Sequence, residues 1–251
     1  MVHIDGRGNG PIYLQVAGSL EALARSLTPN VLFPTEEQLA QSYGVSRPTV
    51  RRALSIVEAK GLVRREQGRG TIVCPPKFIR HLVPARSIVA DFREQGHRLD
   101  TRIVAVDWDC PVGEKLRRNL AGRGQRRVAC ATLVRSVAAE ALVFERHFFS
   151  AELGRKIAFD QAASRSFSKL LAEQAGAPIS HSDTVTEIEP CSVEVAQNLN
   201  IGVGTPVVIQ RFQDHLDGGN LLQAGEMHYR TDRIRFSIVQ NKPPYADGEA
   251  D

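Results

Sequence analysis

Hydrophobic residues in the first third of the chain recur at the spacing of amphipathic helices. Between residues 11 and 28 they are separated mostly by three or four positions, which predicts a helix that begins at Pro11 and stops before Pro29. Thr35 opens a second, shorter helix, because Gln38 completes a capping-box pattern with it and Gly44 ends it. The chain therefore begins with two helices joined by a short irregular segment.

A third helix is predicted from about residue 47 to residue 60, with Ser46 as its N-cap. Its apolar positions form one stripe: Val50, Ala53, Leu54 and Val57. The exposed side carries or is flanked by the polar residues Arg47, Thr49, Arg51 and Arg52. Because only a tight turn containing Gly44 separates this helix from the one before it, the pattern predicts a helix-turn-helix whose last helix presents arginines to DNA.

A short hairpin is expected after the third helix. Residues 62–66 and 71–73 are predicted to form two strands, and Gly68 and Gly70 allow their connection to approach another surface closely. Arg69 lies between these glycines at the tip, where it is placed to enter a minor groove. The hairpin is a wing, and it completes a winged helix-turn-helix domain over residues 1–74.

The rest of the chain alternates short helical patterns with short strand patterns. The expected helices span residues 86–95, 112–120, 166–175 and 192–199, and the expected strands span 101–109, 127–138, 141–150, 181–189, 206–215, 221–230 and 234–239. Strands joined by hairpins and interrupted by helices predict an α+β domain with an antiparallel sheet, over residues 86–240. Prolines at 75, 76 and 84 indicate a linker over residues 75–85, and residues 241–251 are expected to be a flexible tail.

The net charge of +4 is concentrated in the first third of the chain. Residues 1–80 contain 11 Lys and Arg against 6 Asp and Glu, whereas residues 81–251 contain 21 against 22. A basic module joined to a nearly neutral one is typical of a nucleic-acid-binding domain attached to a domain with another role.

Composition excludes several classes of protein. With 42% hydrophobic and 24% charged residues, the 251-residue sequence is that of a folded protein and not of a disordered or collagen-like one. No apolar run approaches the roughly 20 residues that span a bilayer, and the first ten residues lack a signal-peptide core, so we expect a cytoplasmic protein without a membrane partner. The four cysteines have no Cys-x-x-Cys spacing, so we expect free thiols, no bound metal and no cofactor.

The order of these N-terminal signals resembles the GntR family of bacterial transcription regulators. The matching residues are Pro11-Ile12-Tyr13, Phe33-Pro34-Thr35-Glu36, Tyr43-Gly44-Val45-Ser46-Arg47-Pro48-Thr49-Val50-Arg51, Gly61-Leu62-Val63 and Gly68-Arg69-Gly70-Thr71. The match departs at Phe33, where Leu is usual, and at Asn30, where Gly is common. Together, the resemblance and the basic face place the DNA contacts among Thr35, Ser46, Arg47, Thr49, Arg51, Arg52, Gly68, Arg69 and Gly70.

The C-terminal half resembles the UTRA domain, the effector-binding module of the HutC branch of that family, whose fold is similar to chorismate lyase. The resemblance rests on Arg135, Leu142 to Glu145, Ser166, Gly204-Thr205-Pro206 and Tyr229 to Arg233. It implies a small-molecule effector, a double-stranded DNA operator with two-fold symmetry, and a homodimer. We expect the effector to contact Ser87, Arg135, Glu145, Ser166, Gln223 and Tyr229.

Several of these residues are suited to binding an anion, independently of the resemblance. Ser87 and Ser166 each precede a helical stretch, whose free N–H groups favour an anion. Arg135 lies on a central strand, and a buried arginine needs a carboxylate or phosphate partner. That partner is either the effector or Glu145 on the neighbouring strand, and the sequence leaves both open. His147 shares the strand face of Glu145, and we interpret it as a hydrogen-bonded core histidine.

Two departures from the family pattern bear on the effector. Relatives that bind phosphorylated sugars often carry a second arginine two positions before Arg135, where this sequence has Leu133. The position six before Tyr229 is often acidic in the family and is Gln223 here. These differences argue against a phosphosugar while leaving another anion open.

The expected function is that of a ligand-responsive, DNA-binding transcription regulator, a repressor released from a palindromic operator by a small anionic metabolite. One alternative is an enzyme of chorismate-lyase-like fold fused to a DNA-binding module. The sequence has no Gly-x-Ser-x-Gly motif, metal-ligand spacing or phosphate-binding loop, so we expect no catalysis. A second alternative is a purely structural DNA-binding protein whose second domain is sealed.

Overall fold

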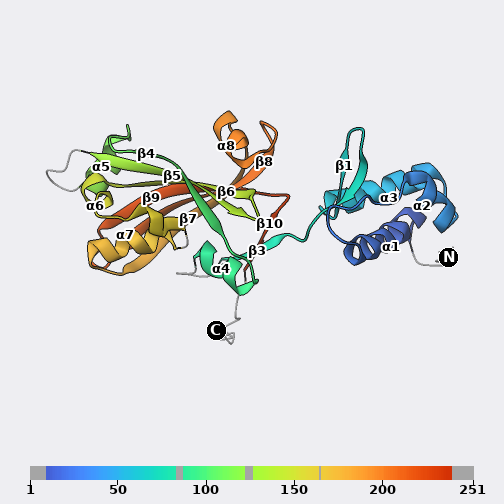
Figure 1. The fold of residues 1–251 in the computed structure, drawn as a ribbon, viewed down its shortest axis with the longest axis horizontal. Coiled ribbons are helices and arrows are strands. Elements are labelled where there is room, and N and C mark those ends of the chain that lie inside the picture. The colour runs from blue at the N-terminus through green and yellow to red at the C-terminus, as the bar shows by residue number, and fades with distance from the viewer. Residues whose placement is uncertain (1–9, 83–86, 122–126, 164, 239–251) are drawn as a thin grey trace, which may run out of the picture. The chain divides into compact units, whose positions relative to one another are not determined.

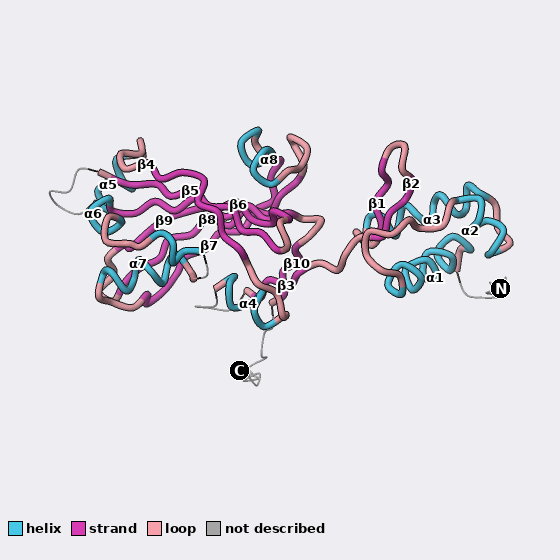
Figure 2. Tube along the Cα trace, viewed as in Figure 1, coloured by secondary structure: helices cyan, strands magenta, loops and turns pink. Residues whose placement is uncertain are grey.

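The computed structural model describes residues 10–82, 87–121, 127–163 and 165–238. The chain divides into two compact units, Met1–Lys77 and Phe78–Asp251. Figure 2 shows that helices dominate the first unit and strands the second. No helix within the described ranges is both long enough and apolar enough to cross a membrane.

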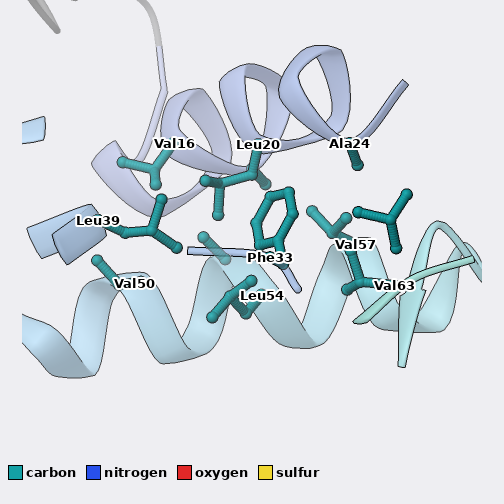
Figure 3. Close-up of a cluster of buried hydrophobic side chains, with 12 residues drawn as sticks. Val16, Leu20, Ala24, Phe33, Leu39, Val50, Leu54, Val57 and Val63 are labelled. Atoms are coloured by element: carbon teal, nitrogen blue, oxygen red, sulfur yellow. The ribbon is translucent and has the colours of Figure 1, made fainter. Parts of the chain in front are cut away.

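The first unit is a three-helix bundle with a hairpin. Its elements are α1 (Ile12–Ser26), α2 (Glu36–Tyr43), α3 (Arg47–Ala59), β1 (Val63–Glu66) and β2 (Gly70–Val73). Leu20 of α1, Leu39 of α2 and Leu54 of α3 are buried with Phe33, which stands in the connection before α2. Figure 3 shows these side chains filling the space between α1 and α3. The apolar stripe predicted for the third helix is therefore the side that forms the core.

Local signals at the helix ends act as the sequence predicts. Thr35 and Gln38 form a reciprocal capping box at the start of α2, and Gly44 ends that helix with a left-handed φ of 65°. Ser46 caps α3 by accepting a hydrogen bond from the amide of Thr49. Asn30, which stands where the family commonly has Gly, has a φ of 67°, a conformation that asparagine tolerates better than most residues.

The second unit is built on a six-stranded antiparallel sheet with the order β4-β5-β6-β9-β8-β7 (Figure 1). The strands are β4 (Asp100–Asp107), β5 (Val128–Val137), β6 (Glu140–Ser150), β7 (Ile179–Pro190), β8 (Pro206–Leu216) and β9 (Leu221–Arg230). The helices are α4 (Ile88–Glu94), α5 (Glu114–Ala121), α6 (Ala151–Gly154), the 3-10 helix η1 (Phe159–Ala163), α7 (Phe167–Ala175) and α8 (Val193–Leu199). The predicted antiparallel α+β architecture is confirmed.

Helices pack on both faces of this sheet. Phe167 and Leu171 of α7 pack against Leu133 and Phe149, on the face that also carries Arg135. Val195 of α8 packs against residues of the opposite face. We name the α7 side the inner face and the α8 side the outer face. Because side chains alternate along each strand, one set of residues faces inward and its neighbours face outward.

The predicted linker over residues 75–85 contains a strand. β3 (Phe78–His81) pairs in parallel with β10 (Ile234–Ser237), and the division between the units falls between Lys77 and Phe78. The irregular connection is therefore shorter than the sequence indicated, because a four-residue strand between prolines leaves too little pattern to recognise. Residues 83–86 and the predicted tail at 241–251 lie outside the described residues.

Candidate DNA-binding and effector sites

The N-terminus of α3 presents a polar surface. Arg47 is exposed and forms no ion pair with any residue that the structure describes. Ser46 and Thr49 share a hydrogen bond between their hydroxyl oxygens at 2.8 Å. The sequence assigned both residues to phosphate contacts, and the structure shows that they also cap α3. Either hydroxyl can do both, because a hydroxyl oxygen donates one hydrogen bond and accepts two.

Two further arginines of α3 are held by neighbours within the unit. Arg51 donates to both carboxylate oxygens of Glu36, at 3.0 to 3.2 Å. Its hydrogen bond and its charge lower the pKa of Glu36 against a smaller opposing effect of burial. The guanidinium of Arg52 lies 3.8 Å from the centre of the Tyr13 ring on α1. Glu36 thus fixes the direction of Arg51, a role that the sequence did not indicate.

In the wing, the carboxylate of Glu66 binds two arginines. Glu66 accepts hydrogen bonds from Arg64 at 2.9 Å and from Arg69 at 3.1 Å, and the hydrogen bond from Arg64 is the main reason that its pKa is lowered. Gly68 and Gly70 have φ values of 75° and 105°, which explains the need for glycine on both sides of Arg69. The Arg69 side chain is 65% exposed, so its ion pair with Glu66 can open toward another anion.

In the second unit, Arg135 and Glu145 form a buried ion pair. The Nε of Arg135 donates to both carboxylate oxygens of Glu145, at 3.1 and 3.2 Å, and the two side chains are 2% and 0% exposed. The other end of the guanidinium donates to the hydroxyl of Thr101 at 2.7 Å and to two backbone carbonyls. Of the two partners left open for Arg135, Glu145 is thus the one observed.

Glu145 begins a chain of hydrogen bonds across the sheet, which is buried as far as Asp214 and ends at the exposed Ser182. Its Oε2 lies 3.1 Å from Nε2 of His147, and Nδ1 of His147 lies 3.1 Å from Oε1 of Gln223. The amide nitrogen of Gln223 donates to Asp214, and Asp214 accepts from the hydroxyl of Ser182. We name Arg135, Glu145, His147, Gln223, Asp214 and Ser182 the polar network; it runs along the inner face from β5 to β7.

The polar network places a side-chain oxygen beside each ring nitrogen of His147. The amide nitrogen of Gln223 must face the Asp214 carboxylate, so its carbonyl oxygen faces Nδ1 of His147. Glu145 faces the other ring nitrogen, so both nitrogens of His147 lie beside side-chain oxygens. Burial alone raises the pKa of Glu145, but Arg135 and His147 outweigh it and hold that pKa below its ordinary value of 4.5.

The first turn of α7 adjoins the polar network at two points. Arg135 donates to the carbonyl of Arg165, the residue before the N-cap Ser166, at 3.4 Å. Gln223 donates to the hydroxyl of Ser168 in the first turn. The Ser166 side chain itself makes no capping hydrogen bond. The structure therefore brings Arg135, Glu145, Gln223 and the start of α7 into one region.

Ser87 and Tyr229 belong to a neighbouring cluster. Ser87 caps α4 by accepting from the amide of Ala90, and Asp91 of that helix accepts from Arg80 of β3 at 2.5 Å. Burial raises the pKa of Tyr229 to about 12, against the lowering effect of Arg80. The charge of Glu145 also acts on Tyr229, so this cluster lies within electrostatic reach of the polar network.

Sequence reasoning missed several members of the site. Thr101, Asp214, Ser182 and Arg80 had not been assigned a role. Asp214 lies two residues after the inward-facing Phe212 on β8 and therefore shares its face, so its position on the buried face was the available signal. The expectation that His147 is a hydrogen-bonded core histidine is confirmed.

Comparison with known families and proteins agrees with this geometry. Residues 12–73 match the model described as bacterial regulatory proteins, gntR family, and residues 94–235, more than half of the chain, match the UTRA domain. The HTH-type transcriptional repressor NagR of Bacillus subtilis is 27% identical over 238 residues, which cover 94% of this chain and 97% of NagR.

Two other relatives show how far the likeness extends. The mannosyl-D-glycerate transport/metabolism system repressor MngR of Escherichia coli is 25% identical over 240 residues, covering 94% of this chain and 98% of MngR. The crystal structure of PhnF from Mycobacterium smegmatis has a TM-score of 0.63 at 22% identity, covering 91% of this chain and 100% of that one. NagR and MngR are named as repressors and the matching N-terminal family is one of regulatory proteins, so the alternative of a chorismate-lyase-like enzyme is set aside. The chain belongs to the GntR family of bacterial regulatory proteins with a UTRA domain, and it is a ligand-responsive, DNA-binding transcription regulator.

Proposed function

We propose that the protein is a homodimeric repressor that binds a two-fold symmetric operator and is released from it by a small anionic metabolite. The observation that carries this proposal is Arg135, a buried cation beside the first turn of α7 in a domain separate from the DNA-binding unit. Cytoplasmic placement follows from this role, because the operator is chromosomal DNA.

On DNA, the exposed start of α3 enters the major groove, and the wing places Arg69 at the adjacent minor groove. Arg47 and Arg51 are assigned to base edges or phosphates, and the hydroxyls of Ser46 and Thr49 to phosphates. Glu36 holds the Arg51 guanidinium in one orientation before DNA arrives, which lowers the entropy lost on binding. Two units acting together supply the affinity that one small winged domain lacks, which is the reason to propose a dimer.

The effector is proposed to bind beside Arg135 by displacing Glu145. A ligand carboxylate or phosphate offers the guanidinium the same two oxygens, and the free amides at the start of α7 with the hydroxyl of Ser166 favour negative charge. The charge of the polar network then changes, and Glu145 needs a new partner. MngR is named for a mannosyl-D-glycerate system, and glycerate is a carboxylate, which makes sugar acids reasonable first candidates.

Coupling to the DNA-binding unit is proposed to run through β3. This strand is the first element after the boundary at Lys77, and its Arg80 contacts Asp91 of α4 and the Tyr229 region of β9. A change in the charge of Glu145 acts on Tyr229 and through it on Arg80. The effector needs to favour the released arrangement by only about 1–3 kcal/mol for a useful response.

The test uses the full chain and an operator selected from a random DNA pool. Fluorescence anisotropy gives the affinity, and a panel of sugar acids, dicarboxylates, amino-acid catabolites and phosphonates is screened for release. We expect a carboxylate or phosphonate to release the wild type while Arg135→Lys, which retains charge but loses the two-oxygen geometry, responds at least tenfold more weakly. Release only by uncharged sugars would contradict the anionic effector, and monomeric binding to a single half-site would contradict the dimer.

A further inference from the structure

Three potential metal ligands gather on the outer face at the far edge of the sheet. His181 and Asp183 lie two residues apart on β7, so both point to the same face. His215 on β8 is the register partner of His181. One donor atom from each of the three lies within 4.8 Å of the other two. The site is separate from the polar network, which occupies the inner face.

Hydrogen bonds orient both imidazoles with the same nitrogen available. Nδ1 of His215 lies 3.4 Å from the carbonyl oxygen of Gly219, which only accepts, so this nitrogen carries the proton. Ser180 donates its hydroxyl hydrogen to the carbonyl of His215 and therefore accepts from Nδ1 of His181. Each neutral ring then holds its lone pair on Nε2. Fixing the second nitrogen of a histidine in this way is what protein metal sites commonly do.

The free nitrogen of His215 faces negative charge. Its Nε2 is shielded from solvent and has no hydrogen-bond partner among the described residues, yet it lies 3.7 Å from Oδ2 of Asp183. A lone pair directed at a carboxylate is unfavourable unless a proton or a metal cation lies between them. The neighbouring His181 ring is parallel to that of His215, with 4.5 Å between centroids, and adds a second nitrogen to the same space.

We propose that His181, Asp183 and His215 bind a zinc ion, with water completing a tetrahedral site. Two imidazoles and one carboxylate suit zinc, whereas calcium and magnesium require more oxygen ligands. Bonds of about 2.0–2.2 Å place zinc ligands about 3.3 Å apart. His181 and Asp183 are both exposed, so their side chains have room to rotate toward His215 and close the present separation.

Zinc at this position ties the edge strand to the rest of the sheet. β7 pairs with β8 alone within the sheet order. Ser182 lies between the two β7 ligands, and Asp214 precedes His215. The ligands therefore lie on the opposite face of the sheet from the hydrogen bond between Ser182 and Asp214, which is the last of the polar network. Metal bound on the outer face therefore holds in register the two residues that end this network on the inner face.

The experiment titrates the chelator-treated full chain with zinc by calorimetry and with cobalt by visible absorption. We expect one zinc per chain, a tetrahedral cobalt spectrum without sulfur charge transfer, and affinity at least tenfold lower in His181→Ala and Asp183→Asn. The matched controls are His97→Ala and Asp160→Asn, which replace exposed residues after α4 and in η1 and should bind zinc as the wild type does. Zinc should also raise the unfolding temperature of the wild type but not of His181→Ala.

Three results would overturn the proposal. One is a wild type that binds no zinc at millimolar concentration, which would mean that only a proton joins His215 and Asp183. Another is binding that survives in both ligand variants. The last is a cobalt spectrum with sulfur charge transfer, which would place the metal on cysteine. Because the cobalt spectrum is recorded on the wild type, the test does not depend on the folding of any variant.

Discussion

Replacing Arg135 with alanine removes the only guanidinium that contacts Glu145 among the described residues. The carboxylate is 0% exposed and would be left with His147 as its charged partner. Removing one member of a buried ion pair typically costs 3–5 kcal/mol, and the remaining contact with His147 places the expected loss near the lower end, about 3 kcal/mol. The Arg135→Ala variant should therefore be clearly less stable in its effector unit, while its DNA-binding unit is unchanged.

The assay exploits Trp108, the single tryptophan of the sequence. It follows β4 and packs edge-on against Phe159, so its fluorescence reports unfolding of the effector unit alone. With an m-value of about 2 kcal/mol/M for a unit of this size, a loss of about 3 kcal/mol lowers the urea midpoint by about 1.5 M. Arg211→Ala is the control, because its ion pairs with Glu187 and Glu189 are exposed and should contribute less than about 1 kcal/mol.

A double-variant cycle identifies the cause. Adding Glu145→Gln to Arg135→Ala removes the stranded charge, so the double variant should be more stable than the sum of the single effects by at least about 1 kcal/mol. Additive effects, or an Arg135→Ala midpoint equal to that of the Arg211→Ala control, would refute the reasoning from burial. Operator affinity measured on the same proteins should stay near that of the wild type.

Three further predictions address other contacts. Arg47→Ala and Arg51→Ala should each weaken operator binding about tenfold and leave the unfolding curve unchanged. Fluorescence anisotropy at several salt concentrations shows which contact was lost: loss of a base contact leaves the salt dependence of the affinity unchanged, whereas loss of a phosphate contact flattens it. Arg69→Ala should lose most affinity on operators with A·T-rich flanks, whose minor groove is narrow; equal losses on G·C-rich flanks would limit Arg69 to phosphate. Because folding lowers the pKa of Glu145, the ionised carboxylate stabilises the folded unit above pH 4.5, and this stabilisation is lost as the pH falls from 4.5 toward about 2. The free energy of unfolding of Glu145→Gln, followed by Trp108 fluorescence, should therefore decrease less steeply in acid than that of the wild type.

The parts of the fold that depend on local signals could be predicted from the sequence. The capping box at Thr35, the left-handed turn at Gly44 and the N-cap at Ser46 each act within a few residues, so the helix-turn-helix followed directly. The hairpin of β5 and β6 is equally local, and it brings Arg135 near Glu145 as expected. The tight match to a family motif added the DNA-contact assignments, which stay predictions.

The remaining features depend on pairing between distant segments. β3 pairs with β10 from the other end of the unit, and no local pattern announces a four-residue strand of that kind. The bonds of Gln223 to His147 and Asp214 require the registers of β6 with β9 and of β9 with β8. His215 meets His181 in the same way, across a strand pair, so a search for ligands at short spacing along the chain passes over that cluster.

The long edge strand β7 also bears on how the protein behaves in concentrated solution. Its outer hydrogen-bonding edge is unpaired in the sheet order, and Val185 and Ile188 are 60% and 71% exposed. An open edge with exposed β-branched residues is a template for aggregation, and charge is the usual protection. On β7 the carboxylates of Asp183, Glu187 and Glu189 supply this charge. The negative charge of these side chains therefore protects the open edge, and variants that replace them with neutral residues should aggregate at a lower concentration than the wild type.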